Sequence, residues 1–320
     1  MSKRQLIFGV IFLEKNLKNK NVTFAEKLQK RQNSTVNIKR LATQRRLYSK
    51  AKKINYFNFM ITVFIPILIL ILPTIPDWSF FRIQVVTLIF HVYTLAVILL
   101  QYWLTTYSSN LKKAAAHIQL EFDIDVFDLK WDKRFLGTNT DSSELVAREF
   151  EKVSKKDLKV LNNWYDLNGL SKKENKVIVR LCQKQNLQWS FTIRKRANRG
   201  FNIFMGTSII ICFLIMLFLK ANLVQITNGI VNFAPLITWI ITINKNYKRD
   251  KNILNELYDL LNDKRYSECT ALLIEAKITE YRQNSSLIPD FVYRIYRKDD
   301  EKVYRQAQSI TVESHVSQTK

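Results

Sequence analysis

The chain has 320 residues and a formal net charge of +23 at pH 7, from 50 Lys or Arg and 27 Asp or Glu residues. Its three cysteines form an odd set, which excludes a disulfide framework, and none of its six glycines falls in a phosphate-binding cluster. A basic chain can bind nucleic acid, but no recognition helix, zinc finger or RNA-binding signature is present, so we expect no nucleic-acid polymer as a partner.

Four long apolar runs divide the chain into two pairs. The runs are Phe57–Ile75, Phe81–Leu104, Phe201–Leu219 and Leu223–Ile243. About 20 residues at about 1.5 Å rise per residue cross the roughly 30 Å hydrocarbon layer, so each run is long enough to span a bilayer. The sequence therefore predicts an all-α membrane protein with four transmembrane helices, arranged as two hairpins, and a helical cytoplasmic domain.

The charges outside the runs predict the orientation. Residues 1–56 carry a net +13, residues 107–200 a net +7 and residues 244–320 a net +2, whereas the link within each hairpin is short and nearly uncharged. Because Lys and Arg accumulate on the cytoplasmic side, we predict that these three segments and both termini are cytoplasmic. The basic N-terminal segment also faces the anionic lipid headgroups. The apolar stretch before Glu14 is too short to span and lacks a cleavage site, so we interpret it as an extension and not as a signal peptide.

The predicted organisation is a basic N-terminal segment (1–56), a first hairpin (57–106), a cytoplasmic helical domain (107–200), a second hairpin (201–243), and C-terminal helices with a tail (244–320).

Helical spacing of apolar residues predicts the elements outside the membrane. In chain order we expect helices over 33–55 and 111–127, a loop over 137–143, a turn over 166–169 and one or two helices over 245–283. The first two helices are continuous with the first and second spans. Ser171 and Glu174 have the spacing of a capping box, so a helix beginning at Ser171 should run toward the third span. The last dozen residues are polar and predicted to be disordered.

Polar residues share one face of the second span and one face of the fourth. They are Gln84, Thr87, His91, Thr94 and Gln101 on the second span, and Gln225, Asn228 and Asn232 on the fourth. Polar groups at membrane depth are costly unless they face protein or water, so both stripes should point inward. Two interpretations stay open: hydrogen bonds that hold the helices together, or the lining of an aqueous path. Four helices enclose little space, so a conducting state would need several chains.

No catalytic constellation is visible in the sequence. The three histidines are far apart, and there is no Ser-His-Asp order, HExxH or CxxC pair. The closely spaced Asp123, Asp125 and Asp128 would spread around a helix, so we interpret them as a solvated face and not as a metal site. We therefore expect no enzyme, no cofactor and no metal, and an integral membrane enzyme is the weakest alternative.

Three stretches around the spans carry a resemblance to a known family. They are Arg31-Gln32-Asn33 with residues 41–52, residues 114–123 with Val126-Phe127 and Trp131, and Asn163-Trp164-Tyr165 with residues 181–186, Trp189 and Arg194. In this order around two pairs of spans, they resemble the SMODS-associating four-transmembrane effectors. The resemblance covers about residues 31–245. It departs from the family pattern at Leu120, where we expect Glu after Ile118-Gln119.

Members of that family are regarded as pore-forming effectors of bacterial antiphage systems, and their genes lie beside nucleotidyltransferases that make cyclic oligonucleotides. The resemblance implies an inner-membrane effector that oligomerises and breaches the membrane when a cyclic oligonucleotide binds. Such a ligand needs cations for its phosphates and aromatic rings for its bases. The candidate ligand-binding residues are Lys130, Trp131, Trp164, Tyr165, Arg180, Lys184, Trp189 and Arg194. For each tryptophan the alternative is packing in the cytoplasmic core or at the headgroups, and for Arg194 it is anchoring of the third span. The main alternative function is a membrane-tethered sensor or scaffold that never conducts.

Overall fold

The computed structural model describes residues 22–64, 83–154, 158, 160–218, 227, 231, 234–288 and 295. Several sequence predictions lie outside these residues: the N-terminal extension, the polar residues Gln225, Asn228 and Asn232, and the tail beyond residue 288.

Every element among the described residues is helical, which agrees with the all-α prediction. In chain order they are α2 (Phe24–Gln32), α3 (Thr35–Phe59), the π-helical turn η1 (Met60–Phe64), α5 (Ile83–Phe127), α6 (Lys133–Leu136), α7 (Ser143–Phe150), α9 (Asn175–Phe218), α11 (Ala234–Asn262) and α12 (Glu268–Asn284).

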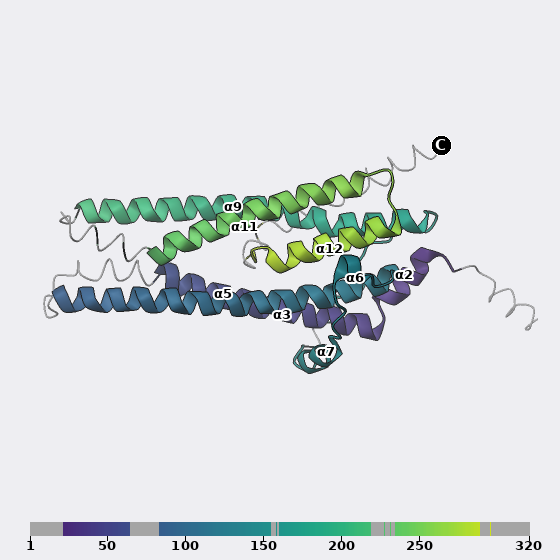
Figure 1. The fold of residues 1–320 in the computed structure, drawn as a ribbon, viewed down its shortest axis with the longest axis horizontal. Helices are drawn as coiled ribbons and strands as arrows, with labels where there is room; N and C mark the ends of the chain where they lie inside the picture. Colours follow the sequence, from purple (N-terminus) through teal and green to yellow (C-terminus); the bar gives the residue numbers. More distant parts are fainter. Residues whose placement is uncertain are drawn as a thin grey trace, which may run out of the picture.

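Three helices are much longer than a membrane span. Helix α5 has 45 residues, α9 has 44 and α11 has 29. At about 1.5 Å per residue, α9 extends about 66 Å, roughly twice the hydrocarbon thickness. The predicted continuity is confirmed: the second span and residues 111–127 form one helix, and the helix before the third span continues into it. Figure 1 shows α3 beside α5 and α9 beside α11, with α12 between these two pairs.

Local capping explains where the shorter helices begin. Thr23 and Glu26 form a capping box at the start of α2, and the Ser34 side chain accepts a hydrogen bond from Asn37 N at the start of α3. The single helix expected over 33–55 therefore begins at Thr35. The capping box expected at Ser171 is wrong, because α9 begins at Asn175 after a series of turns. Of the one or two helices expected over 245–283, the structure has two: α11, which already begins at Ala234, and α12.

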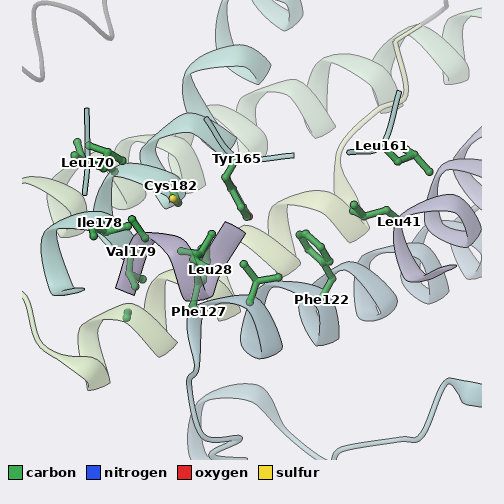
Figure 2. Close-up of a cluster of buried hydrophobic side chains, with 14 of the residues drawn as sticks. Leu28, Leu41, Phe122, Phe127, Leu161, Tyr165, Leu170, Ile178, Val179 and Cys182 are labelled. Atoms are coloured by element: carbon green, nitrogen blue, oxygen red, sulfur yellow. The ribbon is translucent and has the colours of Figure 1, made fainter. Parts of the chain in front are cut away.

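The buried core lies at one end of the long helices. Figure 2 shows its main cluster, in which Leu28 of α2, Leu41 of α3, Phe122 of α5 and Ile178 of α9 gather around the loop residue Tyr165. The Tyr165 ring lies 5.1 Å from that of Phe127 and 6.2 Å from that of Phe122. Five segments that are distant in sequence thus share one apolar interior, which we call the core end.

The other end of the same helices exposes its apolar side chains, and we call it the apolar end. The exposed residues are Leu88, Ile89, Val92, Leu95 and Leu99 on α5, Ile203, Ile210, Phe213 and Leu217 on α9, and Ile237 and Ile241 on α11. Water would disfavour so large an apolar surface, whereas lipid would not. Within the described residues, one helical segment, Arg194–Ile215, is long and apolar enough to cross a membrane. It coincides with the third predicted span, and the other three spans stay predictions.

Two asparagines join α9 and α11 within the apolar end. Asn202 Nδ2 donates to Asn244 Oδ1 at 2.9 Å, and Asn244 Nδ2 donates to Asn202 Oδ1 at 3.1 Å. Each amide therefore satisfies the other where water is scarce, and the pair fixes the register of the two helices.

This pair gives a double-mutant test of the helix register. Asn202→Leu alone strands one amide, so we expect a loss of about 1 kcal/mol in unfolding free energy in lipid or detergent. Asn202→Leu/Asn244→Leu should cost less than the sum of the two single changes. Thr207→Val is the control, because the exposed Thr207 hydroxyl bonds only Phe204 O of its own helix. Strict additivity of the two single effects would contradict the register.

Candidate functional site

The polar residues of the second span divide between the interior and the surface. Thr94 and Gln101 are buried, at 6% and 9% exposure, so their inward orientation is confirmed. His91 is exposed in this single chain, so it does not lie in the interior with Thr94 and Gln101, and its predicted place on a path formed by several chains stays a prediction. The buried positions in this part of α5 are Thr94, Val97, Gln101, Leu104 and Ser108, a spacing of three and four. Gln84 and Thr87 belong to α5, but their side chains are outside the described set.

Hydrogen bonds between α5 and the preceding segment use the same interior. Tyr93 Oη donates to Ile61 O at 2.5 Å, and Ser108 Oγ donates to Ala51 O at 3.5 Å. These contacts show that polar side chains of α5 bond the preceding helical segment, although neither Tyr93 nor Ser108 belongs to the predicted stripe. The aqueous-path interpretation stays a prediction.

A buried pair of carboxyl groups lies at the core end, between α5 and α12. Asp123 is fully buried, so the prediction that it belongs to a solvated face is wrong. Its Oδ2 accepts from Arg282 Nη1 at 2.7 Å, and its Oδ1 accepts from Tyr165 Oη at 2.5 Å. Both partners are distant in sequence, and they supply what water would otherwise provide. Asp125 and Asp128 are exposed, as predicted.

The second carboxyl group of the pair is Glu275, which is also fully buried. Gln183 Nε2 donates to Glu275 Oε1 at 2.9 Å, and Tyr266 Oη donates to Gln183 Oε1 at 2.8 Å. Burial and the neighbouring Asp123 carboxylate raise the pKa of Glu275 to about 8. Glu275 therefore holds a proton at neutral pH, and the single Arg282 guanidinium balances the single Asp123 charge.

Three cations from three long helices meet at the C-terminal end of α12. Lys112 Nζ of α5 donates to Ser285 O at 3.1 Å, Arg249 Nη2 of α11 donates to Asn284 O at 2.7 Å, and Arg194 Nη1 of α9 donates to Ser286 O at 2.5 Å. The last carbonyls of a helix have no intrahelical partner and carry partial negative charge, so cations stabilise them. We call this cluster the helix-end junction.

Burial strengthens the junction. Arg194 also donates to Ser285 Oγ at 2.9 Å, and its guanidinium lies 4.8 Å from the centre of the Tyr281 ring. Asp250, 2% exposed, lies 3.7 Å from Arg194. Burial raises the pKa of Asp250 to about 6 and lowers the pKa of Lys112 to about 8. One helix end thus ties together all three helices that continue into the apolar end.

Several buried polar atoms near these two clusters have no hydrogen-bond partner among the described residues. They are Gln44 Oε1 and Tyr48 Oη on α3, Arg194 Nε and Asn198 Oδ1 on α9, and Glu275 Oε2 and Thr279 Oγ1 on α12. On each helix the two residues are four apart and share a face. Unpaired buried groups cost free energy, so this interior is the least satisfied part of the described packing.

The predicted ligand-binding residues occupy separate places in this chain. Lys130 is exposed, while Trp131 is half-buried and donates Nε1–H to Gly137 O at 3.0 Å beside α6. Trp164 is 37% exposed, with its ring edge toward Phe122. Tyr165 is a core residue, 1% exposed, so its placement fits packing and not base stacking.

The predicted residues of α9 are spread along that helix. Arg180 Nε donates to Leu261 O at the end of α11, and its guanidinium lies over the Tyr266 ring. Lys184 is half-buried, and that burial, with the nearby Arg180, lowers its pKa. Arg194 belongs to the junction, which lies about 21 Å along the helix from Arg180 at about 1.5 Å per residue. The Trp189 side chain is outside the described set. Arg180, Lys184 and Arg194 therefore do not form one contiguous surface in a single chain.

The residues that hold α12 are not among the predicted site residues. Glu275 and Arg282 lie on the same helical stripe as Leu272 and Ile278, at steps of three and four. Charged residues at buried positions of an apolar stripe require partners, so this spacing was the available signal.

Among the described residues, long helices join a packed core to an exposed apolar end, and one of their segments is long and apolar enough to cross a membrane, which are features of a helical membrane protein. The family model described as the SMODS-associating 4TM effector domain matches residues 26–309. The chain therefore belongs to the SMODS-associating 4TM effector family, which confirms the resemblance and extends it at both ends. A protein of Bacillus cereus (strain VD146), named "Probable CBASS effector molecule", is 28% identical over 304 residues, which cover 89% of this chain and 99% of that protein. No solved structure matches the chain.

The pKa of Glu275 predicts a pH dependence of stability. A carboxyl group whose pKa is raised by folding contributes stability that is fully present below its ordinary pKa of 4.5 and is lost as the pH rises through about 8. The wild-type midpoint of thermal unfolding should therefore fall between about pH 6.5 and pH 8, above the range in which Asp250 titrates. Glu275→Gln should reduce this fall, whereas the exposed control Glu280→Gln should not. Parallel pH profiles for all three proteins would contradict the assignment.

The junction predicts a large effect of one arginine. Arg194→Gln leaves Asp250 buried with its main cation removed, so we expect a loss of about 3 kcal/mol in unfolding free energy. Arg194→Gln/Asp250→Asn should recover part of it. Lys195→Gln removes the same charge from an exposed neighbour and should leave stability within about 0.5 kcal/mol of wild type. Equal losses for Arg194→Gln and Lys195→Gln in denaturant titrations would contradict the junction.

Proposed function

We propose that this chain is a membrane effector of bacterial antiphage defence, which disrupts the inner membrane when a cyclic oligonucleotide reaches its cytoplasmic part. Membership of the SMODS-associating 4TM effector family supports this role, and so does the name of the Bacillus cereus relative, which describes a CBASS effector. The proposed organisation is two hairpins in the membrane, with both termini and the core end in the cytoplasm.

One observation carries the proposal: α5, α9 and α11 each run without interruption from the core or the junction into the exposed apolar end. A displacement at the core end is then transmitted directly to the membrane, because a helix is stiff over this length. Such an arrangement suits an effector, whose output is in the bilayer and whose input is in the cytoplasm.

Helix α12 is the proposed switch element. It packs against α5, α6, α9 and α11. Its polar contacts lie at two places, the carboxyl pair along the helix and the junction at its C-terminal end. These contacts are charged and specific. The buried polar atoms beside them lack hydrogen-bond partners among the described residues, so a rearranged interior that pairs those atoms would be lower in free energy at that point. Rearrangement of α12 would therefore release three helices together. Converting a 1:99 population to 99:1 needs about 5.5 kcal/mol of differential ligand binding, which a few phosphate and stacking contacts could supply.

The proposed trigger site is the part of the predicted set that solvent reaches at the core end. Trp164 and Lys130 are exposed there, and Lys184 of α9 is half-buried. Since the predicted residues are dispersed in one chain, a complete site would form between chains, which links binding to oligomerisation. Oligomers also accommodate His91, because an exposed imidazole at membrane depth favours a protein or aqueous environment over lipid.

Disruption is proposed to occur without chemistry on a substrate, since the sequence offers no catalytic set. The alternative is a sensor or scaffold that binds the signal and never conducts. The hydrogen bonds from Tyr93 and Ser108 of α5 to the preceding helical segment favour such a closed bundle as the resting form.

Calorimetry with cyclic di- and trinucleotides on the solubilised protein, paired with dye release from liposomes, tests the proposal. We expect one ligand to bind below about 10 μM, roughly −7 kcal/mol, and to release dye. Trp164→Ala should weaken binding about tenfold through lost stacking with no change in salt dependence. Lys184→Gln should weaken binding and reduce the salt dependence.

Val160→Ala is the matched control for Trp164, because Val160 is exposed in the same loop and carries no ring. Nucleotide binding without dye release would contradict the effector function and support the alternative, a sensor or scaffold that does not conduct. Dye release with no bound nucleotide would move the trigger to a protein partner.

A further inference from the structure

All four long helices carry basic residues at the level of the junction. Lys112, Arg194 and Arg249 share this level because all three contact the end of α12. Helix α3 reaches it too, since Ala51 O accepts from Ser108 Oγ, one helical turn before Lys112. These three cations contact the end of α12, but the same helical turns carry others that make no such contact.

Further cations on these turns of the four helices are exposed, and we call them the collar. The collar consists of Lys53 of α3, Lys113 of α5, Lys195 and Arg199 of α9, and Lys245 and Lys248 of α11. None of the six has an ion-pair partner among the described residues. The acid closest in sequence to the last two, Asp250, is buried against Arg194. Within the part of the chain that the structure describes, the collar is therefore a positive surface that no ion pair neutralises.

Exposed aromatic residues follow the collar toward the apolar end. Tyr56 of α3 and Tyr102, Trp103 and Tyr107 of α5 are exposed, and the rings of Trp103 and Tyr107 stack at 5.7 Å. Exposed aliphatic residues come next along α5 and α9. The order from cations to amphipathic rings to aliphatic side chains matches the order from headgroup phosphate to acyl chain in a bilayer leaflet.

We propose that the collar binds the headgroups of anionic phospholipids and gives the protein a preference for them over zwitterionic lipids. A free anion would use the cations but not the adjacent aromatic and aliphatic surface. A lipid uses both, and its phosphate is held at the level of the collar by the acyl chains below. The proposal rests on membrane embedding, and it requires neither the nucleotide trigger nor conduction.

The collar also gives the lipid a route to the proposed switch. In α9, Arg194 holds the end of α12 while Lys195 and Arg199 face outward from the same two turns. In α11, Arg249 and Lys248 divide in the same way. Lipid charge therefore lies within one helical turn of the cations that fix α12.

The test uses the full chain, reconstituted into vesicles of equimolar phosphatidylglycerol and phosphatidylcholine, with retained lipids identified by native mass spectrometry after extraction. We expect phosphatidylglycerol to be enriched over phosphatidylcholine. Each cation near the membrane surface contributes about 1 kcal/mol, so enrichment should fall about fivefold for each collar cation that is removed. The collar variant is Lys195→Gln/Arg199→Gln/Lys248→Gln.

The matched control is Lys172→Gln/Lys176→Gln/Lys264→Gln, which removes three exposed cations at the core end. It should keep the wild-type enrichment. High salt should abolish enrichment in the wild type without any substitution, because the Debye length falls from about 10 Å at 0.1 M to about 3 Å at 1 M. Equal retention of the two lipids, an equal loss in the control variant, or displacement of phosphatidylglycerol by inorganic phosphate would each overturn the proposal.

Discussion

Continuous helices impose the constraint on which the rest of this structure depends. Each of α5, α9 and α11 belongs to the packed interior along one part of its length and exposes aliphatic side chains along another. The exposed aliphatic part of such a helix is stable in lipid and its polar part in water, so the protein lies across a boundary between water and lipid. The Asn202–Asn244 pair and the buried Thr94 and Gln101 follow from this, because polar groups in the apolar end have only each other as partners.

Polar contacts of α12 hold the two helix pairs together at the boundary. Apolar packing alone would tolerate sliding of α12, whereas the Asp123–Arg282 pair and the junction fix its position along three neighbours. Buried charge is weak evidence for stability but a good device for specifying one arrangement. The protonated Glu275 and the unpaired polar atoms nearby raise the free energy of this interior. Less free energy is then needed to convert it into a different arrangement. Stability and the capacity to switch therefore come from the same few residues.

Periodicity predicted the elements well, because apolar spacing reports burial directly. The helix over residues 111–127 and the helix that leads into the third predicted span follow from spacing, whereas spacing left open whether residues 245–283 form one helix or two. Pairing between distant residues was not predictable in this way. Asp123 was assigned to solvent because its partners Arg282 and Tyr165 are 159 and 42 residues away. His91 lies three residues before the buried Thr94, so spacing alone predicts the same face, yet its side chain is exposed in this single chain. The candidate ligand-binding residues were predicted from their charge and aromatic character, and these properties do not predict which side chains lie close together in the fold.

Solvent accessibility of the apolar end tests the central claim most directly. In a background with Cys182, Cys212 and Cys269 replaced, a single cysteine would be placed at Ile210, exposed in the isolated chain, or at the exposed Lys176 of the core end of the same helix. In native membranes opened to both sides, a membrane-impermeant maleimide should label Lys176→Cys rapidly and leave Ile210→Cys unlabelled until the membrane is dissolved in denaturant. Equal labelling rates at the two positions in intact membranes would place the apolar end in water and contradict the account.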